Sequence, residues 1–270
     1  MSLNDAVEFG TKYTKKRDVL FVLENVAGFT AGDVLIRGET EFPKRLFGEY
    51  ESKLKRLHIG EPLQYVLGKW EFCGTEYITD KRALIPRPET ELLAEMVIDY
   101  VKNKEKLHIL DVCTGSGCIG LSIAKLTSHN VVLADISIDA LDLARQNHQA
   151  MGAPPNVQIT ASDLLESVHG EFDVIVSNPP YIESRDMETL PKNVKNYEPL
   201  LALDGGPGGL EVYKKLIPQC FHKLKTGGKL FLEIGPGKTA SYMEKAGFTN
   251  ISVYKDYAGL NRILRGEKNV

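Results

Sequence analysis

An alternation of short apolar runs with longer segments of helical periodicity constrains the fold more than any other feature of this chain. The apolar runs have the length of buried strands and comprise residues 107–113, 131–136, 157–161, 172–177 and 229–234. Segments 117–126 and 139–151 lie between them and favour helices. Parallel strands need long crossover connections, which helices usually supply. The alternation therefore predicts an α/β fold with a parallel sheet covered by helices on both faces.

The carboxyl-terminal part of this pattern has two departures. Residues 250–253 and 262–265 read as strands with a short connection, so we expect an antiparallel pair at one edge of the sheet. Residues 182–207 interrupt the alternation. A loop of this length in a compact domain is usually functional.

The first third of the chain has another organisation. Residues 1–66 predict a small helical domain, in which Leu46, Tyr50 and Leu54 recur at helical spacing. Residues 67–85 alternate as strands do and predict a hairpin-like linker. Pro88 suits the first position of a helix, and residues 86–270 form the expected main domain.

Composition narrows the functional classes. The 270 residues carry a net charge of −3, so no global basic field attracts nucleic acid, and we expect no direct nucleic-acid binding. The sequence has no run of 18 apolar residues, so we expect no membrane span. The four cysteines form no C-x-x-C pair, and no H-E-x-x-H is present. We therefore expect free thiols in the cytoplasm and no metal site.

Small residues follow the first apolar strand, where residues 111–117 run Asp-Val-Cys-Thr-Gly-Ser-Gly. Such a strand–loop–helix lets the backbone approach a ligand and presents free N–H groups. Asp135 ends the next strand, where a carboxylate can hold ribose hydroxyls, and Asp163 follows the third, where it can accept from an adenine amino group. A nicotinamide cofactor would use similar geometry, and the glycine loop alone could be a tight turn with a Ser/Thr cap. Ser162-Asp163 alone could be a helix N-cap.

The most informative motif is Asn178-Pro179-Pro180-Tyr181, directly after the strand at 172–177. Its two prolines stiffen the turn and remove backbone donors. The Asn178 oxygen and the Pro179 carbonyl then offer two acceptors for the N–H groups of a planar –NH₂, while the Tyr181 ring can lie against its face. A plain Asn-Pro turn is the alternative.

This pair of acceptors addresses a chemical difficulty. An amide nitrogen is a poor nucleophile because its lone pair is delocalised, and acceptors on both N–H groups raise its electron density. The sulfonium of S-adenosylmethionine is already an activated methyl donor, so position and electrostatics can supply most of the catalysis. The motif therefore predicts methyl transfer from S-adenosylmethionine to a planar amide-type nitrogen, without a strong general base.

Taken together, these residues resemble the glutamine-N5 methyltransferases of peptide-chain release factors. The likeness runs nearly end to end. It is carried by the glycine loop, by Asn178 to Tyr181, and by residues 64–68, 86–91, 197–199, 202–203 and 205–206. The resemblance implies a seven-stranded, Rossmann-like methyltransferase sheet with a small N-terminal helical domain that binds substrate. It also implies class I release factors as partners, methylated on the glutamine of a Gly-Gly-Gln loop.

The resemblance also implies roles for individual residues. The expected catalytic residues are Asn178, Pro179 and Tyr181. The expected contacts to S-adenosylmethionine are Asp111, Thr114, Gly115, Gly117, Asp135, Asp163 and Asn178. The expected substrate contacts are Asn178, Pro179, Pro180, Tyr181 and Glu198.

Two positions depart from the family pattern. Cys113 stands where many relatives have the first glycine of the loop, so we expect its backbone to avoid the angles reserved for glycine. Gly208 stands where the family usually has Asp. The remaining motifs are intact.

Two other functions share the central motif. A nucleic-acid N6-adenine or N4-cytosine methyltransferase would use the same four residues on a flipped base. The acidic net charge and the lack of a basic arm argue against it. A catalytically silent S-adenosylmethionine-binding partner of the ribosome is the second, and the intact Asn178–Tyr181 motif argues against silence.

Overall fold

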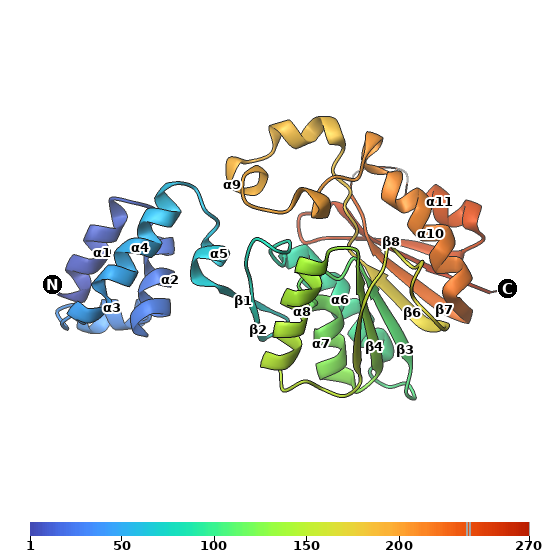
Figure 1. Ribbon diagram of the computed structural model, residues 1–270, viewed down its shortest axis with the longest axis horizontal. Coiled ribbons are helices and arrows are strands. Elements are labelled where there is room, and N and C mark those ends of the chain that lie inside the picture. Colours follow the sequence, from blue (N-terminus) through green and yellow to red (C-terminus); the bar gives the residue numbers. More distant parts are fainter. Residues whose placement is uncertain (236, 238, 270) are drawn as a thin grey trace. The chain divides into compact units, whose positions relative to one another are not determined.

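The computed structural model describes residues 1–235, 237 and 239–269, which form two compact units (Figure 1). The first unit comprises residues 1–69 and 191–197, and the second comprises residues 70–190 and 198–270. The chain therefore passes between the units three times. Most of the expected linker, from Trp70 onward, belongs to the second unit, because Phe72 and Tyr77 are buried in its core.

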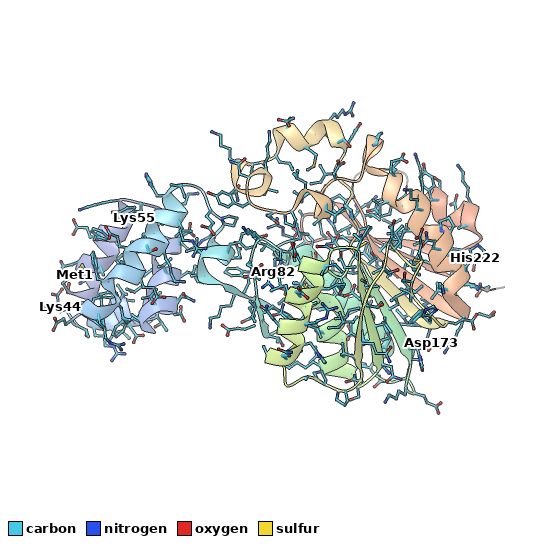
Figure 2. All side chains as sticks on the ribbon, in the orientation of Figure 1. Met1, Lys44, Lys55, Arg82, Asp173 and His222 are labelled. Atoms are coloured by element: carbon cyan, nitrogen blue, oxygen red, sulfur yellow. The ribbon has the colours of Figure 1, made fainter. Side chains whose placement is uncertain are left out.

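The first unit is helical, as its sequence pattern predicts. Its helices are α1 (Leu3–Thr11), α2 (Lys16–Ala27), α3 (Ala31–Arg37), α4 (Phe47–His58) and α5 (Leu63–Leu67), with α9 (Lys192–Lys195) in its later segment. Capping boxes at Ser2 and Thr30 start α1 and α3. Tyr50 is fully buried between these helices and donates a hydrogen bond to the Ala6 carbonyl. Charged side chains such as those of Lys44 and Lys55 project from the surface (Figure 2).

The second unit contains a seven-stranded sheet in the order β5-β4-β3-β6-β7-β9-β8. Its strands are β3 (His108–Val112), β4 (Asn130–Asp135), β5 (Val157–Ala161), β6 (Phe172–Ser177), β7 (Leu224–Glu233), β8 (Thr249–Lys255) and β9 (Asn261–Glu267). Strands β3 to β7 pair in parallel, and β9 pairs antiparallel with β7 and β8. The parallel sheet and its antiparallel edge pair are thus confirmed.

Helices cover both faces of this sheet. They are α6 (Pro88–Val101), α7 (Cys118–Thr127), α8 (Ile138–Ala150), α10 (Glu211–Lys223) and α11 (Ala240–Ala246). Successive β3 residues face opposite ways, so Ile109 joins the core that includes α6 and α7, and Leu110 the core that includes α10 and α11. Short 3₁₀ turns at Ser184–Thr189, Leu200–Ala202 and Pro207–Gly209 occupy the interruption at 182–207.

A two-stranded hairpin of β1 (Lys69–Phe72) and β2 (Thr75–Ile78) precedes the sheet. Pro88 then stands at the start of α6, with Glu89 and Glu91 in its first turn, as predicted.

Candidate active site

One pocket opens at the carboxyl ends of the parallel strands. The chain runs from β3 outward to β4 and β5, and then returns to β6 on the other side of β3. Such a reversal of strand order leaves a crevice in which α/β proteins bind ligands. The pocket there has an empty volume of about 1180 Å³, its open mouth included.

The glycine loop lines this pocket, with Asp111 behind it. Thr114 and Gly115 line the pocket, whereas Asp111 is fully buried. Asp111 Oδ2 accepts hydrogen bonds from Thr114 Oγ1 at 2.5 Å and from the Gly120 N–H at 2.9 Å. In the described part of the chain, Asp111 Oδ1 is a buried oxygen without a hydrogen-bond partner. Burial raises the pKa of this carboxyl to about 7, against the lowering effect of the two hydrogen bonds.

Gly117 has a structural position in the same loop. It caps α7 with a left-handed φ of 82°. A Cβ there would lie 3.0 Å from Leu121 Cδ1 and 3.2 Å from Ala144 Cβ. Gly117 therefore permits the turn and the close packing of α7 and α8, and it is not among the described residues that line the pocket.

Two further carboxylates line the pocket from neighbouring strands. Asp135, at the end of β4, accepts hydrogen bonds from the Gly115 and Ser137 N–H groups, each at 2.9 Å. Burial raises the pKa of Asp135, and these backbone hydrogen bonds oppose the shift. Asp163, beyond β5, is exposed at the pocket wall. Both carboxylates thus line the pocket beyond the ends of adjacent strands.

Asn178 reaches the pocket from the end of β6. The buried Ser177 hydroxyl donates to the Val112 carbonyl at 2.6 Å and fixes this end of β6 against β3. Asn178 and Pro180 line the pocket. The Asn178 amide nitrogen donates to Thr90 Oγ1 at 3.1 Å, and its Oδ1 accepts no hydrogen bond from any residue the structure describes. Asn178 therefore lines the pocket and has one side-chain acceptor without a partner among the described residues.

The other three expected substrate contacts lie outside the described pocket lining. Pro179 is buried. Tyr181 packs beside Gly235, where a Cβ would come within 2.6 Å of its ring, and its hydroxyl donates to Glu233 Oε1 at 3.3 Å. Glu198 is buried, forming an ion pair with Arg87 at 2.5 Å and accepting from the Ile85 N–H. It thereby anchors the segment whose Pro199, Leu201 and Ala202 line the pocket.

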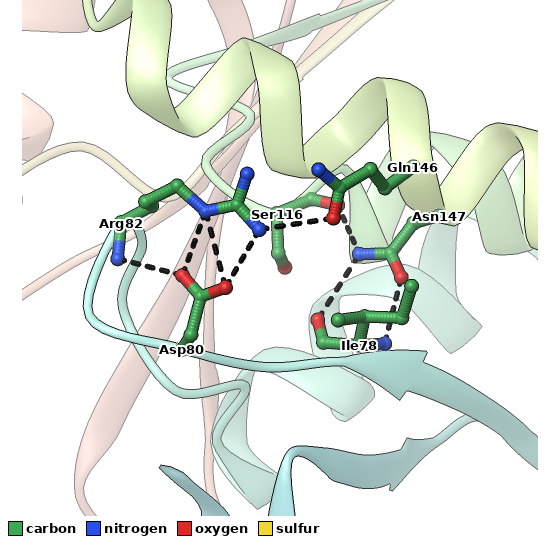
Figure 3. A network of polar contacts seen from close by, with 6 residues as sticks. All are labelled: Ile78, Asp80, Arg82, Ser116, Gln146 and Asn147. Atoms are coloured by element: carbon green, nitrogen blue, oxygen red, sulfur yellow. Dashed lines mark hydrogen bonds and ion pairs between the residues drawn. The ribbon is translucent and has the colours of Figure 1, made fainter.

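The segment that follows β2, most of it within the expected linker, forms a wall of the pocket. Residues 82–86 line the pocket. Arg82 is held by Asp80, and it donates to Gln146 on α8 at 3.0 Å (Figure 3). The buried Asn147 amide bonds to both backbone groups of Ile78 and donates to the Ser116 carbonyl at 3.0 Å (Figure 3). This network joins the hairpin, α8 and the glycine loop.

Sequence reasoning also missed Thr90, which lines the pocket, and Glu233, which lies behind it. Thr90 Oγ1 donates to Glu233 Oε2 at 2.7 Å, and both residues are buried. The signal for Thr90 was its place in the 86–91 motif, and a buried acidic residue ending β7 was the signal for Glu233.

The structure corrects the expectation for Cys113, whose φ of 58° lies in the left-handed region that glycine favours. A non-glycine residue adopts this conformation at a cost of about 1–2 kcal/mol. Gly208 also has a left-handed φ, of 69°, with open space around its missing Cβ. An Asp would fit there, since Asp enters this region more readily than most residues.

Comparisons with known proteins show the family of this chain. The PrmC N-terminal domain model matches residues 8–68, and the Methyltransferase small domain model matches residues 89–196. The release factor glutamine methyltransferase of Clostridium acetobutylicum is 36% identical over 259 residues, covering 93% of this chain and 87% of its own length. The chain belongs to the release factor glutamine methyltransferase family. The Lactococcus lactis member is 40% identical over 78% of each chain.

Solved structures show the family fold more widely. The Thermus thermophilus 16S rRNA N2 G1207 methyltransferase, in complex with AdoMet and guanosine, matches with a TM-score of 0.56 at 20% identity, covering 74% of this chain and 50% of its own. A ribosomal protein L11 methylase from Lactobacillus delbrueckii subsp. bulgaricus matches with a TM-score of 0.51 at 24% identity, covering 70% of this chain and 82% of its own. Family and fold together make this chain an S-adenosylmethionine-dependent methyltransferase.

The described residues were also considered as metal ligands and as membrane spans. No group of His, Cys, Asp and Glu side chains in them has a metal-binding arrangement. No single helix among them has the length and apolar character to cross a membrane, although α2 and α3 together, bent by 92°, reach that length and composition.

Proposed function

We propose that this enzyme transfers a methyl group from S-adenosylmethionine to the side-chain amide nitrogen of the glutamine in the Gly-Gly-Gln loop of class I peptide-chain release factors. The observation that carries the proposal is the unused Asn178 Oδ1 acceptor at the pocket, in a chain that belongs to this family. The cytoplasm is the proposed compartment, since release factors act there.

The residues present fit S-adenosylmethionine. Thr114, Gly115 and Asn178 line its proposed site, and left-handed Gly115 admits a ligand close to the backbone. Each Asp135 oxygen accepts one backbone hydrogen bond and has a further lone pair for ribose hydroxyls. Asp163 would accept from the adenine amino group. The unpartnered Asp111 Oδ1 suits a donor on the cofactor's cationic amino-acid end.

When bound there, S-adenosylmethionine supplies a methyl group activated by its sulfonium. The chain's own contribution is to hold the glutamine amide. Asn178 Oδ1 would accept one amide N–H. The carbonyl of Pro179, a buried residue between the lining residues Asn178 and Pro180, would accept the other. Together the two acceptors would restrain rotation and increase electron density on nitrogen. Pro180, which lines the pocket, would help to exclude water from the amide. Formation of the new C–N bond would break the bond between the methyl group and sulfur and leave S-adenosylhomocysteine. The proton on the alkylated nitrogen would pass to solvent afterwards, so no strong base is needed first.

Tyr181 and Glu198 support this arrangement from behind the pocket lining. Burial raises the pKa of the Tyr181 phenol to about 12, so it stays a hydrogen-bond donor to Glu233 at neutral pH. Glu198 fixes the pocket-lining segment at 199–202 through Arg87. We assign both residues to holding the substrate site in shape.

The first unit is proposed to bind the body of the release factor. Residues such as Val19, Val22 and Leu54 form a hydrophobic core within the first unit. The first unit is a separate compact unit of the chain. The proposed cofactor contacts all belong to the second unit. A protein substrate needs a larger contact area than one glutamine provides, and the first unit can supply this additional area.

The test offers the enzyme a labelled methyl donor and, in separate reactions, a release factor, the same factor with Gln replaced by Glu in its Gly-Gly-Gln loop, DNA and RNA. The proposal predicts label in the intact release factor alone, on the Gly-Gly-Gln peptide by mass spectrometry. Label in nucleic acid, or equal label in both release factors, would refute it.

A further inference from the structure

A buried relay of hydrogen bonds stands behind Asn178. Asn178 Nδ2 donates to Thr90 Oγ1 at 3.1 Å, and Thr90 Oγ1 donates to Glu233 Oε2 at 2.7 Å. Thr90 and Glu233 are 3% and 1% exposed, so water does not compete for these contacts. The three side chains come from the end of β6, the first turn of α6 and the end of β7.

The orientation of the Asn178 amide decides whether the site works. The oxygen and nitrogen of a side-chain amide have nearly the same size, so a half-turn exchanges an acceptor for a donor without a steric penalty. With its nitrogen toward the substrate, Asn178 would set an N–H against the N–H of the substrate amide. The proposed clamp therefore needs something that distinguishes the two ends.

Thr90 and Glu233 distinguish them by hydrogen-bond polarity. An ionised carboxylate only accepts hydrogen bonds, so the hydroxyl proton of Thr90 must be donated to Glu233. The oxygen of Thr90 can then only accept from Asn178, which requires the –NH₂ end. Oδ1 is left for the pocket. We infer that Thr90, backed by the Glu233 carboxylate, is a positioning residue that turns the acceptor end of Asn178 toward the substrate. This inference rests on the proposed function.

The surroundings of Glu233 set its ionisation, and with it the polarity of the relay. Its Oε1 accepts from the Tyr181 hydroxyl, which itself receives a hydrogen bond from Arg262 on β9. Arg262 is paired with Asp256 at 3.1 Å, and Glu89 on α6 adds negative charge. Burial raises the pKa of Glu233, while Thr90, Arg262 and Tyr181 lower it. A protonated Glu233 can donate a hydrogen bond to Thr90. The Thr90 hydroxyl can then donate to Asn178, which requires the amide oxygen to face Thr90.

The first test uses the hydroxyl of Thr90. T90V removes it, and single-turnover methylation of a release factor at saturating cofactor should slow by about 10-fold or more, because the amide populates both orientations. T90S keeps the hydroxyl and should recover most of the rate. S122A is the matched control, since it removes a buried hydroxyl that bonds Tyr77 at 2.7 Å, outside the pocket lining. It should lower the melting temperature and leave the rate unchanged.

The second test separates positioning from general damage. If Thr90 acts through Asn178, T90V should cost little further rate in an N178A background. The wild-type rate should also fall on acidification through the raised pKa of Glu233, and E233Q should be slow without this acid limb. Equal costs of T90V in both backgrounds, or slowing of T90S to the T90V rate, would overturn the inference. Failure of the wild-type enzyme to methylate any release factor would instead refute the proposed function.

Discussion

Two residues of the glycine loop have features that lower the stability of the fold and lie where a ligand would bind. Cys113 keeps a left-handed backbone without being glycine. Asp111 keeps an oxygen buried without a hydrogen-bond partner in the described residues. Both features cost folding free energy, and both lie at the pocket or directly behind it, where strained and unsatisfied groups concentrate in enzymes.

The backbone of Cys113 gives the first prediction. C113G should change the free energy of unfolding by less than about 1 kcal/mol, because relief of the left-handed strain offsets the greater entropy of an unfolded glycine. C113V should destabilise the protein by about 2 kcal/mol or more, since a β-branched residue is a clear outlier at this φ. Urea denaturation of both variants measures this. Equal stabilities would show that the left-handed φ imposes no cost.

The raised pKa of Asp111 gives a prediction for pH. A carboxyl whose folded pKa of about 7 exceeds its ordinary 3.8 binds more protons in the folded state. Its stabilising contribution is complete below the ordinary value and is lost as the pH rises through about 7. Without cofactor, the stability of the wild type relative to D111N should therefore fall between pH 5 and pH 8. Parallel stability profiles in chemical denaturation would contradict the burial argument.

At the scale of elements, the strand–loop–helix pieces could be predicted because their signals are local. The apolar runs, the small loop residues and the Asn-Pro-Pro turn each lie within a few residues. The wall at residues 82–86 could not, because its position depends on the hairpin and on Asn147 far along the chain, 69 residues from Ile78. Alternation at 67–85 predicted the strands but gave no sign of what they pack against.

The Asn147 network gives an element-scale prediction. N147A removes three hydrogen bonds that join β2 and the glycine loop to α8, and it leaves buried backbone groups unsatisfied. The free energy of unfolding should fall by about 2–4 kcal/mol, with weaker cofactor binding because the loop loses its anchor. Q146A is the control, since it removes one contact to Arg82 at the surface, and it should cost less than about 0.5 kcal/mol. Equal losses of unfolding free energy in N147A and Q146A would show that the Asn147 hydrogen bonds do not anchor the glycine loop.

At the scale of the whole molecule, the pocket joins segments that are distant in sequence. Thr90 and Glu233 are 143 residues apart, and Arg87 and Glu198 are 111 apart. No periodicity or motif spacing encodes such pairs, so sequence reasoning reached Asn178 and Asp135 but not the residues behind Asn178. It also expected Glu198 at the substrate, where the structure gives its carboxylate to Arg87.

The two units give a prediction about the division of labour. A chain that begins at Lys69 retains the whole described pocket lining and should bind S-adenosylmethionine within about twofold of the full-length affinity. Its kcat/KM for a release factor should fall at least about tenfold, a loss of about 1.4 kcal/mol of binding. Calorimetry and circular dichroism establish that the shortened chain is folded. Full activity on the release factor would mean that the first unit only stabilises the fold.

The central claim is that Asn178 holds the substrate amide through its oxygen. Single-turnover methyl transfer to a release factor, at saturating S-adenosylmethionine, tests it most directly in N178A. The rate should fall by about 10²–10³, the usual cost of losing an aligned hydrogen bond in a desolvated site. Cofactor affinity should fall much less than the rate, because Asn178 is one of several residues that line the proposed cofactor site. A near-normal rate in N178A would contradict the amide clamp.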